Sequence, residues 1–415
     1  MINYIDIYEL KIILDYPLLT MKFKENILIK KNSNMFYRKI QNFILPFAFY
    51  FFRIIKINNK KIFIENYQGL NYFDNGKYIV EEIIRRNINC QIIWAINEKQ
   101  DNNFPPSVNI IPSNTFRYIF HMSTSKIWID NCRKQHYVRK RKKQFYFQTW
   151  HGGISLKKIE KDAENKLTWN YIERAKNDSK MIDCFISHSS YFTNLIRKSF
   201  WYTGRILEIG YPRHDLFFQT NRHDDIKNKV RKYFGIKNEC KLILYCPTFR
   251  NSHDISLYSL NYEKLIYTFK DKFDSDIKIL IRLHPNMIEK SKELEYTNNI
   301  LNASIYSDLQ ELLISCDAMI TDYSSTMFEF ALLNKPIFLY MPDIEEYGRE
   351  RDFRIDINSL TSYSKNFDEL IYNIKTFNLE NYTANMKKKI TKLGIVKKGT
   401  ASKKIVDEIE KILGE

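Results

Sequence analysis

One turn of the chain groups side chains that could bind a phosphate. Asp322 ends an apolar run, and Ser324, Ser325 and Thr326 follow where the next helix should begin. Glu329 lies three residues after Thr326, which is the spacing of a capping box. Free N–H groups at a helix start, the positive end of the helix dipole and nearby hydroxyls together favour a phosphate or diphosphate. Glu329 could also accept a hydrogen bond from a ribose, or be an ordinary exposed glutamate.

A second candidate, His151, suits acid–base chemistry. It follows a strand-like run and precedes Gly152 and Gly153, so it is expected at the carboxyl end of a strand, where two glycines let a substrate approach closely. An imidazole titrates near neutrality and can take the proton of an attacking hydroxyl. The alternative is a histidine that only forms hydrogen bonds within a turn.

Two further side chains converge at the end of another predicted strand. Arg282 and His284 precede Pro285, and the two-residue period of a strand places them on the same face. A cation and a donor placed together suit a diphosphate that gains charge as it leaves. The alternative is an arginine paired with a carboxylate beside a surface histidine. Arg250, after a strand that stops at Pro247, is a weaker candidate for clamping a phosphate or an acceptor.

The motifs of several large enzyme classes are missing. The sequence has no Walker loop, no G-x-G-x-x-G fingerprint, no G-x-S-x-G elbow and no H-E-x-x-H, so NTP hydrolysis and dinucleotide redox chemistry lose support. Asp274 and Asp276 have the spacing of a metal–nucleotide site, but they lie in a charged loop, and a solvated turn is the favoured interpretation. We therefore predict no metal site.

The elements that position these residues follow an α/β pattern. From Lys60 onward, short β-rich runs alternate with helical stretches, which is typical of parallel sheets. A charged stretch at 212–238 interrupts the alternation. We predict an N-terminal extension (1–57) and two doubly wound Rossmann-like domains (58–215 and 216–415). The last helix of the second domain could pack back on the first domain. The ligand is expected in the cleft between them, beyond the carboxyl ends of the strands. The predicted strands are 61–65, 91–95, 126–130, 145–148, 184–187, 206–209, 241–245, 278–283, 318–321 and 337–340.

Length, cysteines and charge bound the class of protein. A chain of 415 residues suits two domains better than one core. The six cysteines have no zinc or redox spacing, and no cleavable signal pattern is found, which indicates reduced thiols in the cytosol. The net charge of +17 should attract nucleotide phosphates, nucleic acid or an anionic membrane. Part of this charge, 139–143, reads as a solvated loop.

Nucleic-acid binding is the interpretation from another functional class. It requires surface aromatic side chains among the cations. Most Tyr and Phe residues lie instead inside apolar strand-like runs, so we predict no nucleic-acid partner.

The stretch 42–55 is strongly apolar and is flanked by Lys and Arg. A membrane-spanning helix needs about 20 apolar residues, and this run is shorter and broken by Pro46 and Arg53. It fits an interfacial helix on an anionic leaflet. A helix packed into the core is the equal alternative.

Five motifs, in this order and spacing, resemble the CDP-glycerol glycerophosphotransferases, the teichoic-acid and capsule enzymes of GT-B architecture. The resemblance extends from about Lys60 to the C-terminus, and segments 126–131 and 399–402 are also similar. The motifs are Gln148-Thr149-Trp150-His151-Gly152, Gly210-Tyr211-Pro212-Arg213-His214-Asp215, Pro247-Thr248-Phe249-Arg250, Arg282-Leu283-His284-Pro285 and the stretch that opens at Ile320.

The resemblance implies transfer of glycerol phosphate, or a related polyol phosphate, from a CDP-activated donor to a hydroxyl of a lipid-linked glycan or growing polymer, with release of CMP. It implies that His151 is the base and that His284 stabilises the diphosphate. It implies no required cofactor and a peripheral location at the cytoplasmic face of the membrane. The expected donor-binding residues are Arg250, Arg282, Asp322, Ser324, Ser325, Thr326 and Glu329.

The chain departs from the family pattern at two places. Family members often read Trp-His-Gly-Thr-Pro, whereas 153–155 is Gly-Ile-Ser here. This loop, with Trp150, Gly152 and Gly153, is the expected acceptor side, so the acceptor stays open. Lys397 and Lys398 stand where acidic residues are frequent.

A GT-B glycosyltransferase or sugar-nucleotide epimerase with another nucleotide-sugar donor is the alternative enzyme. The sequence does not predict which polyol is transferred, whether one unit or many are added, or the oligomeric state.

Overall fold

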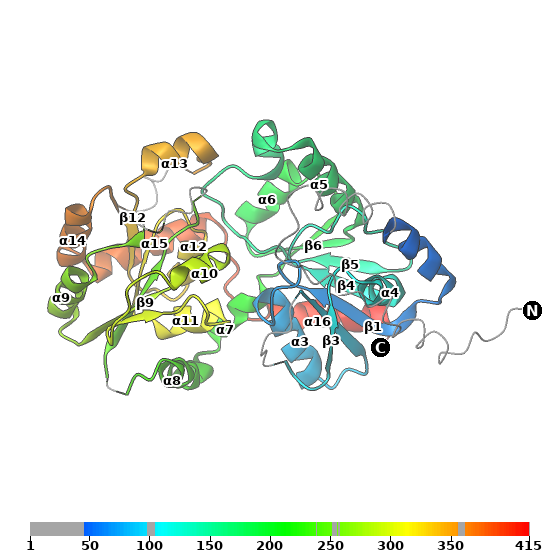
Figure 1. Ribbon diagram of the computed structural model, residues 1–415, viewed down its shortest axis with the longest axis horizontal. Coiled ribbons are helices and arrows are strands. Elements are labelled where there is room, and N and C mark those ends of the chain that lie inside the picture. The colour runs from blue at the N-terminus through cyan, green and yellow to red at the C-terminus, as the bar shows by residue number, and fades with distance from the viewer. Residues whose placement is uncertain are drawn as a thin grey trace, which may run out of the picture.

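Two parallel β-sheets covered by helices organise the protein (Figure 1). The computed structural model describes residues 45–97, 104–237, 239–250, 255, 258–355 and 362–414. Every strand pair in both sheets is parallel, so the predicted α/β class is confirmed.

The first sheet has seven strands in the order β3-β2-β1-β4-β5-β6-β7. Its central strands are continuous apolar runs, as burial on both faces requires. The strands are β1 (Asn58–Glu65), β2 (Gln91–Ile96), β3 (Val108–Pro112), β4 (Ser125–Asp130), β5 (Phe145–Gln148), β6 (Cys184–Ser187) and β7 (Arg205–Glu208). The main helices are α3 (Asp74–Arg85), α4 (Phe116–Thr124), α5 (Trp169–Met181) and α6 (Ser190–Ser199).

The second sheet has six strands in the order β10-β9-β8-β11-β12-β13. They are β8 (Lys241–Cys246), β9 (Ile277–Ile281), β10 (Ile300–Asn302), β11 (Ala318–Thr321), β12 (Ile337–Tyr340) and β13 (Tyr363–Ser364). The helices are α8 (His223–Tyr233), α9 (Tyr262–Phe273), α10 (Ile288–Ser291), α11 (Leu309–Ser315), α12 (Thr326–Ala331), α13 (Ile344–Arg351), α14 (Phe367–Lys375) and α15 (Leu379–Lys392).

The strand order reverses once in each sheet, between β1 and β4 and between β8 and β11. Loops at the carboxyl ends of strands diverge at such a switch point and leave a crevice for a ligand. The candidate residues follow these four strands or their direct neighbours, β5 and β9.

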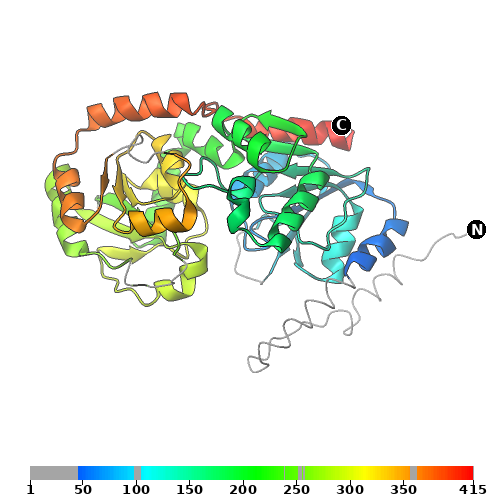
Figure 2. The same cartoon turned by 90° about the horizontal axis from the view of Figure 1, so that it is seen from above.

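The chain crosses between the two halves twice. It leaves the first through η3 (Pro212–His214) and α7 (Asp215–Phe218), and it returns through 393–400 into α16 (Ala401–Leu413), whose buried face joins the first core (Figure 2). The crossings meet, because the Asp215 carboxylate accepts hydrogen bonds from the N–H groups of Ala401 at 2.9 Å and Ser402 at 2.7 Å.

The described end of the N-terminal extension is a short helix over 45–51 followed by η1 (Phe52–Ile54). Phe49 and Phe52 are buried in the first core, whereas Phe51 and Ile54 are 63% and 83% exposed. One face of the segment therefore packs into the core, as one interpretation predicted, and the interfacial role of the exposed face stays a prediction. The 139–143 run is less free than expected, since its Arg141 guanidinium donates to the carbonyls of Ile55 and Arg53. Residues 1–44 lie outside the described residues.

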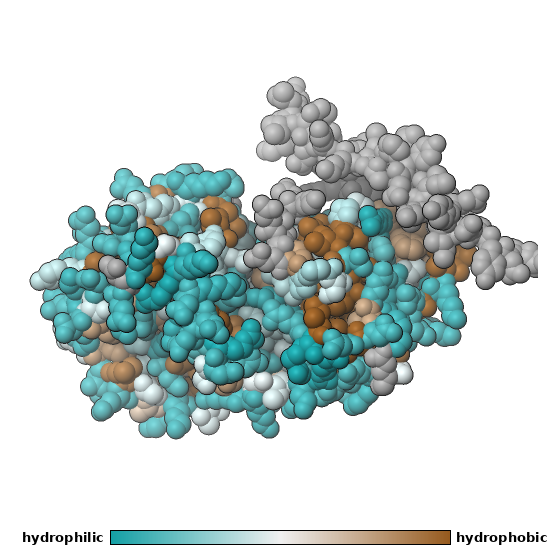
Figure 3. Space-filling model, turned by 90° about the horizontal axis from the view of Figure 1, so that it is seen from below, coloured by the Kyte–Doolittle hydropathy of each residue, from teal (hydrophilic) through white to brown (hydrophobic). Residues whose placement is uncertain are grey.

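Apolar side chains are unevenly distributed over the surface. Seen from below, they gather on the half formed by the first domain, while the other half is mostly hydrophilic (Figure 3). Within the described ranges, no helix combines the length and the apolar character needed to cross a bilayer.

Candidate active site

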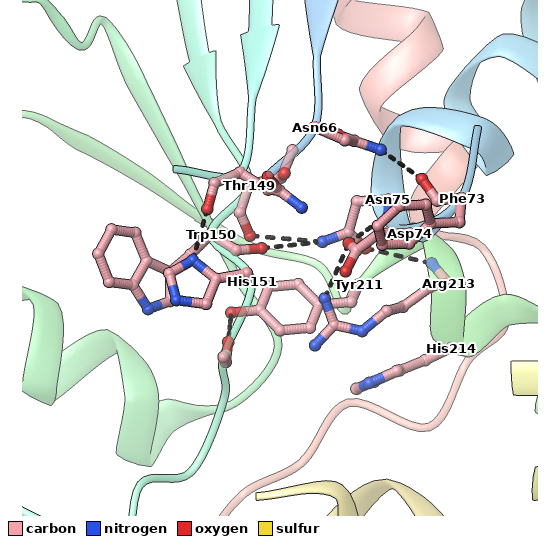
Figure 4. Close-up of polar contacts among 12 residues, drawn as sticks. Asn66, Phe73, Asp74, Asn75, Thr149, Trp150, His151, Tyr211, Arg213 and His214 are labelled. Carbon is pink, nitrogen blue, oxygen red and sulfur yellow. Dashed lines mark hydrogen bonds and ion pairs between the residues drawn. The ribbon is translucent and has the colours of Figure 1, made fainter. Parts of the chain in front are cut away.

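His151 follows β5, where the backbone adopts an unusual conformation. Trp150 has φ +55°, in the left-handed region that non-glycine residues rarely occupy. The Asn75 side-chain amide donates to the Trp150 carbonyl at 3.2 Å, and the Trp150 N–H donates to Gln148 Oε1 at 2.8 Å (Figure 4). These bonds hold the turn that presents His151.

The tautomer of His151 is set by its backbone partner. Its Nδ1 lies 2.8 Å from the carbonyl oxygen of Asn131, which can only accept, so Nδ1 carries the proton and Nε2 keeps its lone pair. Although solvent reaches the ring, the protein atoms crowded around it lower the pKa of His151, against the opposing effects of the Asn131 carbonyl and Asp74. A neutral imidazole with an open Nε2 can act as a general base.

His284 has the opposite arrangement. Its Nδ1 accepts a hydrogen bond from the Asn286 N–H at 3.2 Å, so Nε2 carries the proton of the neutral ring and can donate. Desolvation by the surrounding protein lowers the pKa of His284 to about 4, and the charges of Lys157 and His151 act in the same direction. His151 follows β5 of the first sheet and His284 follows β9 of the second, so the two histidines come from different domains.

Arg282 offers a fixed positive charge beside His284. Its Nη1 donates to the carbonyls of Ala303 at 3.0 Å and Tyr306 at 2.5 Å, which anchors the half-buried guanidinium. Burial lowers its pKa, but an arginine remains charged at neutral pH. No carboxylate of the described residues forms an ion pair with it, so this cation is suited to an anionic ligand.

The side chains of Asp322 and Arg250 form ion pairs and hydrogen bonds within the protein. Their side chains pair at 2.9 Å, and Arg250 also pairs with Asp343 at 2.6 Å. Asp322 accepts from the Thr248 N–H at 2.8 Å, which ties the loop after β8 to the end of β11. Direct contact of Asp322 or Arg250 with a donor stays a prediction. No group of three or more His, Cys, Asp or Glu side chains in the described ranges is arranged to hold a metal ion.

The hydroxyl-rich turn lies where it was expected, but the capping box is wrong. Thr326 is the first residue of α12, and Ser325 is its N-cap without a side-chain cap bond. Ser324 Oγ instead donates to Thr326 Oγ1 at 3.0 Å. All three hydroxyl residues are half-buried. Glu329 does not accept a hydrogen bond from the backbone at the start of α12, because its carboxylate forms charge-assisted bonds with other side chains.

The partner of Glu329 is Arg213, which sequence reasoning placed in a motif without giving it a role. Arg213 is 2% exposed and bonds Asp74 at 3.0 Å (Figure 4). It also bonds Glu329 at 2.8 Å, so it links α3, η3 and α12. The other Glu329 oxygen accepts from Gln310 at 3.0 Å. Burial alone would raise the pKa of Glu329, but Arg213 and His214 hold it well below its ordinary value. A ribose contact for Glu329 stays a prediction.

The residues expected on the acceptor side mainly support the histidine. The Trp150 ring is 5% exposed and lies 4.6 Å from the His151 ring. A Cβ at Gly153 would lie 2.9 Å from the ring of His188, so only glycine fits there. The Gly152 carbonyl accepts from the Tyr211 hydroxyl at 2.6 Å. Acceptor contacts of Trp150, Gly152 and Gly153 stay predictions.

Sequence reasoning missed Tyr67, Asp74 and Asn75. The Tyr67 ring lies 5.5 Å from the His151 ring and its φ is +45°. Asp74 also has a positive φ, of 60°. Strained non-glycine residues cluster at functional sites, but φ is not readable from sequence. The one available signal was the polar Asp74-Asn75 pair at the start of a predicted helix.

Comparisons with known proteins find relatives that match most of the chain. A family model described as CDP-Glycerol:Poly(glycerophosphate) glycerophosphotransferase matches residues 47–411. The chain is 29% identical over 397 residues to a teichoic acid poly(glycerol phosphate) polymerase of Bacillus spizizenii, covering 92% of this chain and 100% of the relative. It is 31% identical over 312 residues to a teichoic acid glycerol-phosphate transferase of Staphylococcus aureus, covering 72% of this chain and 79% of the relative. It spans only 42% of a polymerase of the same kind from Staphylococcus epidermidis.

Solved structures with a similar fold are also found. A histidine-to-alanine variant of the wall teichoic acid polymerase TagF has a TM-score of 0.79 and 27% identity, covering 93% of this chain and 99% of that one. A TagF structure soaked with CDPG has a TM-score of 0.78 at 27% identity, covering 93% and 98%. The two-sheet architecture is thus the GT-B-like fold of TagF.

Proposed function

Since the chain belongs to the CDP-glycerol:poly(glycerophosphate) glycerophosphotransferase family, we propose that it transfers glycerol phosphate, or a related polyol phosphate such as ribitol phosphate, from a CDP-activated donor. The acceptor is a hydroxyl of a lipid-linked glycan or of a growing teichoic-acid or capsule polymer, and CMP is released. Family membership confirms the resemblance seen in the motifs. The observation that carries the proposal is that the two histidines have opposite tautomers, His151 with a free Nε2 lone pair and His284 with an Nε2 proton.

In this mechanism His151 Nε2 accepts the proton of the acceptor hydroxyl. The oxygen then bonds to the phosphorus nearest the polyol, and the bond from that phosphorus to the oxygen of CMP breaks. His284 donates to the diphosphate, and Arg282 balances the charge that grows on the leaving CMP. The hydroxyls of Ser324 and Ser325 bind the remaining phosphate oxygens. Most of the acceleration comes from alignment and charge stabilisation.

The enzyme acts peripherally at the cytoplasmic face of the membrane. Exposed Phe51 and Ile54 lie beside Arg53 and Lys56, a combination of apolar and basic side chains that suits an anionic bilayer surface. The need for no cofactor stays a prediction.

The test supplies the purified chain with CDP-glycerol or CDP-ribitol and a lipid-linked acceptor and measures CMP. We expect release that depends on the acceptor. No CMP from any CDP-polyol, or turnover of a UDP- or CMP-sugar instead, would refute the proposal in favour of a glycosyltransferase or epimerase.

A further inference from the structure

A cavity of about 370 Å³ lies between β12, α14 and α15, and it is lined by neither His151, His284 nor any other candidate site residue. The rings of Phe377 and Tyr382, 5.3 Å apart, are among its lining. Neither the donor site nor the proposed reaction uses it.

One side of α15 gives this cavity its chemistry. Asn381, Asn385 and Lys389 follow one another at four-residue intervals, so they lie along the same side of the helix, and all three line the cavity. Lys392 continues the row one turn further. None of these side chains bonds to a described residue, and among the described residues no carboxylate lines the cavity.

The row combines two kinds of recognition. Carboxamides both donate and accept, so they match hydroxyl groups, whereas ammonium groups attract phosphates. Lysines near a helix C-terminus also interact favourably with the helix dipole, so the charges alone would prove little. The carboxamides, and the absence of carboxylates among the described lining residues, distinguish this cavity from an ordinary basic helix end. Together with the lysines they suit a ligand that is both polyhydroxylated and anionic.

We propose that the α15 cavity binds a segment of an anionic polyol-phosphate chain, the product or elongated acceptor of the enzyme. The proposal rests on the proposed function, since it names a second contact for the same polymer. While the cleft adds a unit, this site holds a part of the chain that is already made. Holding the chain between additions favours repeated transfer over release, because the tethered end stays at high local concentration.

The test uses the full chain and a fluorescent, lipid-free poly(glycerol phosphate) oligomer. Lys389→Glu with Lys392→Glu should weaken binding about tenfold and shorten the polymer made, because two attractive contacts become repulsive. Asn381→Leu with Asn385→Leu should also weaken binding, at unchanged net charge. CMP release with a short acceptor should stay at the wild-type rate in both variants. The matched control is Lys232→Glu with Lys237→Glu, two exposed lysines on and just after α8.

Unchanged binding in both double variants would overturn the inference. If only the lysine variant lost binding, the cavity would act as a charged surface alone, and the assignment of a polyol site would be overturned. An equal loss of binding in the α8 control would overturn it as well. Failure of the wild type to release CMP is a different result, since it would refute the proposed function itself.

Discussion

At the scale of single residues, the two histidines differ in what their Nδ1 atoms contact. The Nδ1 of His151 faces a carbonyl oxygen, and that of His284 faces an N–H group. Each contact fixes the opposite property at Nε2, which is the atom left for a substrate. Both histidines were identified from the sequence, but their tautomers were not, since the partners are backbone groups of Asn131 and Asn286.

Replacing His151 by Ala should lower kcat about 10²- to 10⁴-fold with little change in the KM for the donor, because the base acts only as the proton moves. CMP release under saturating donor measures this effect. His136→Ala, at an exposed histidine, is the matched control. Near-normal turnover in the His151 variant would remove it from the mechanism.

The pH dependence follows from the lowered pKa of His151. The base is active when neutral, so kcat/KM should be constant near pH 7 and fall as the pH drops through the pKa of His151. This pKa lies below the ordinary value of about 6.5, because the protein atoms crowded around the ring disfavour its charged form. A rate profile from pH 4 to 8 checks this; an acid limb centred above 6.5 would contradict it.

At the scale of elements, the sequence predicted the central strands well and missed three at the edges. β5, β6, β11 and β12 begin and end where expected. The sequence missed three strands, β3, β10 and β13, and each of them is an edge strand that pairs with one neighbour only. An edge strand needs no long apolar run, and β13 has just two residues, so neither composition nor period marks it.

The candidate site was predictable to a similar degree. Sequence pattern identified the side chains that follow the central strands, because parallel strands bring their carboxyl ends together. The sequence pattern failed where a side chain bonds to a residue far away in the sequence instead of to its local neighbours. Glu329 had the spacing of a capping residue, but Arg213 lies 116 positions away and the pattern could not indicate it.

The contact of Asp215 with α16 yields a prediction at this scale. Asp215→Ala removes the carboxylate that accepts from two N–H groups at the helix start, so the protein should lose about 1–2 kcal/mol of unfolding free energy. Urea unfolding monitored by circular dichroism measures the loss. Asp225→Ala, at an exposed position on α8, should change little; equal effects of the two changes would refute the capping role.

At the scale of the whole molecule, the Arg213–Glu329 pair joins the two domains. Glu329→Met removes one of the two carboxylates that Arg213 pairs with, and Arg213→Met removes the cation from both, so each change breaks a buried ion pair and should cost about 3–5 kcal/mol. The double replacement should cost less than the sum of the single ones, because the two side chains interact. Thermal unfolding of the three variants tests this, and strictly additive losses would show that the pair is not coupled.

Membrane attachment is a second prediction for the whole molecule. Removing the N-terminal extension is a poor test, since Leu45, Phe49 and Phe52 belong to the first core. Phe51→Glu with Ile54→Glu changes only its exposed face and should reduce co-flotation with anionic vesicles. Tyr267→Glu with Tyr372→Glu adds the same charge at exposed positions of the second domain and should not. Equal flotation of both variants would exclude a role for this face.

The return of α16 to the first domain has a consequence for how the protein is made. The ribosome releases the seven strands of the first sheet long before α16, whose Ile405, Val406 and Ile409 complete their core. The second domain, contained between the two crossings, emerges whole before that point. We therefore expect the domain synthesised first to finish folding last, so that a released chain truncated just before Ala401 has a protease-resistant second half and a protease-sensitive first half.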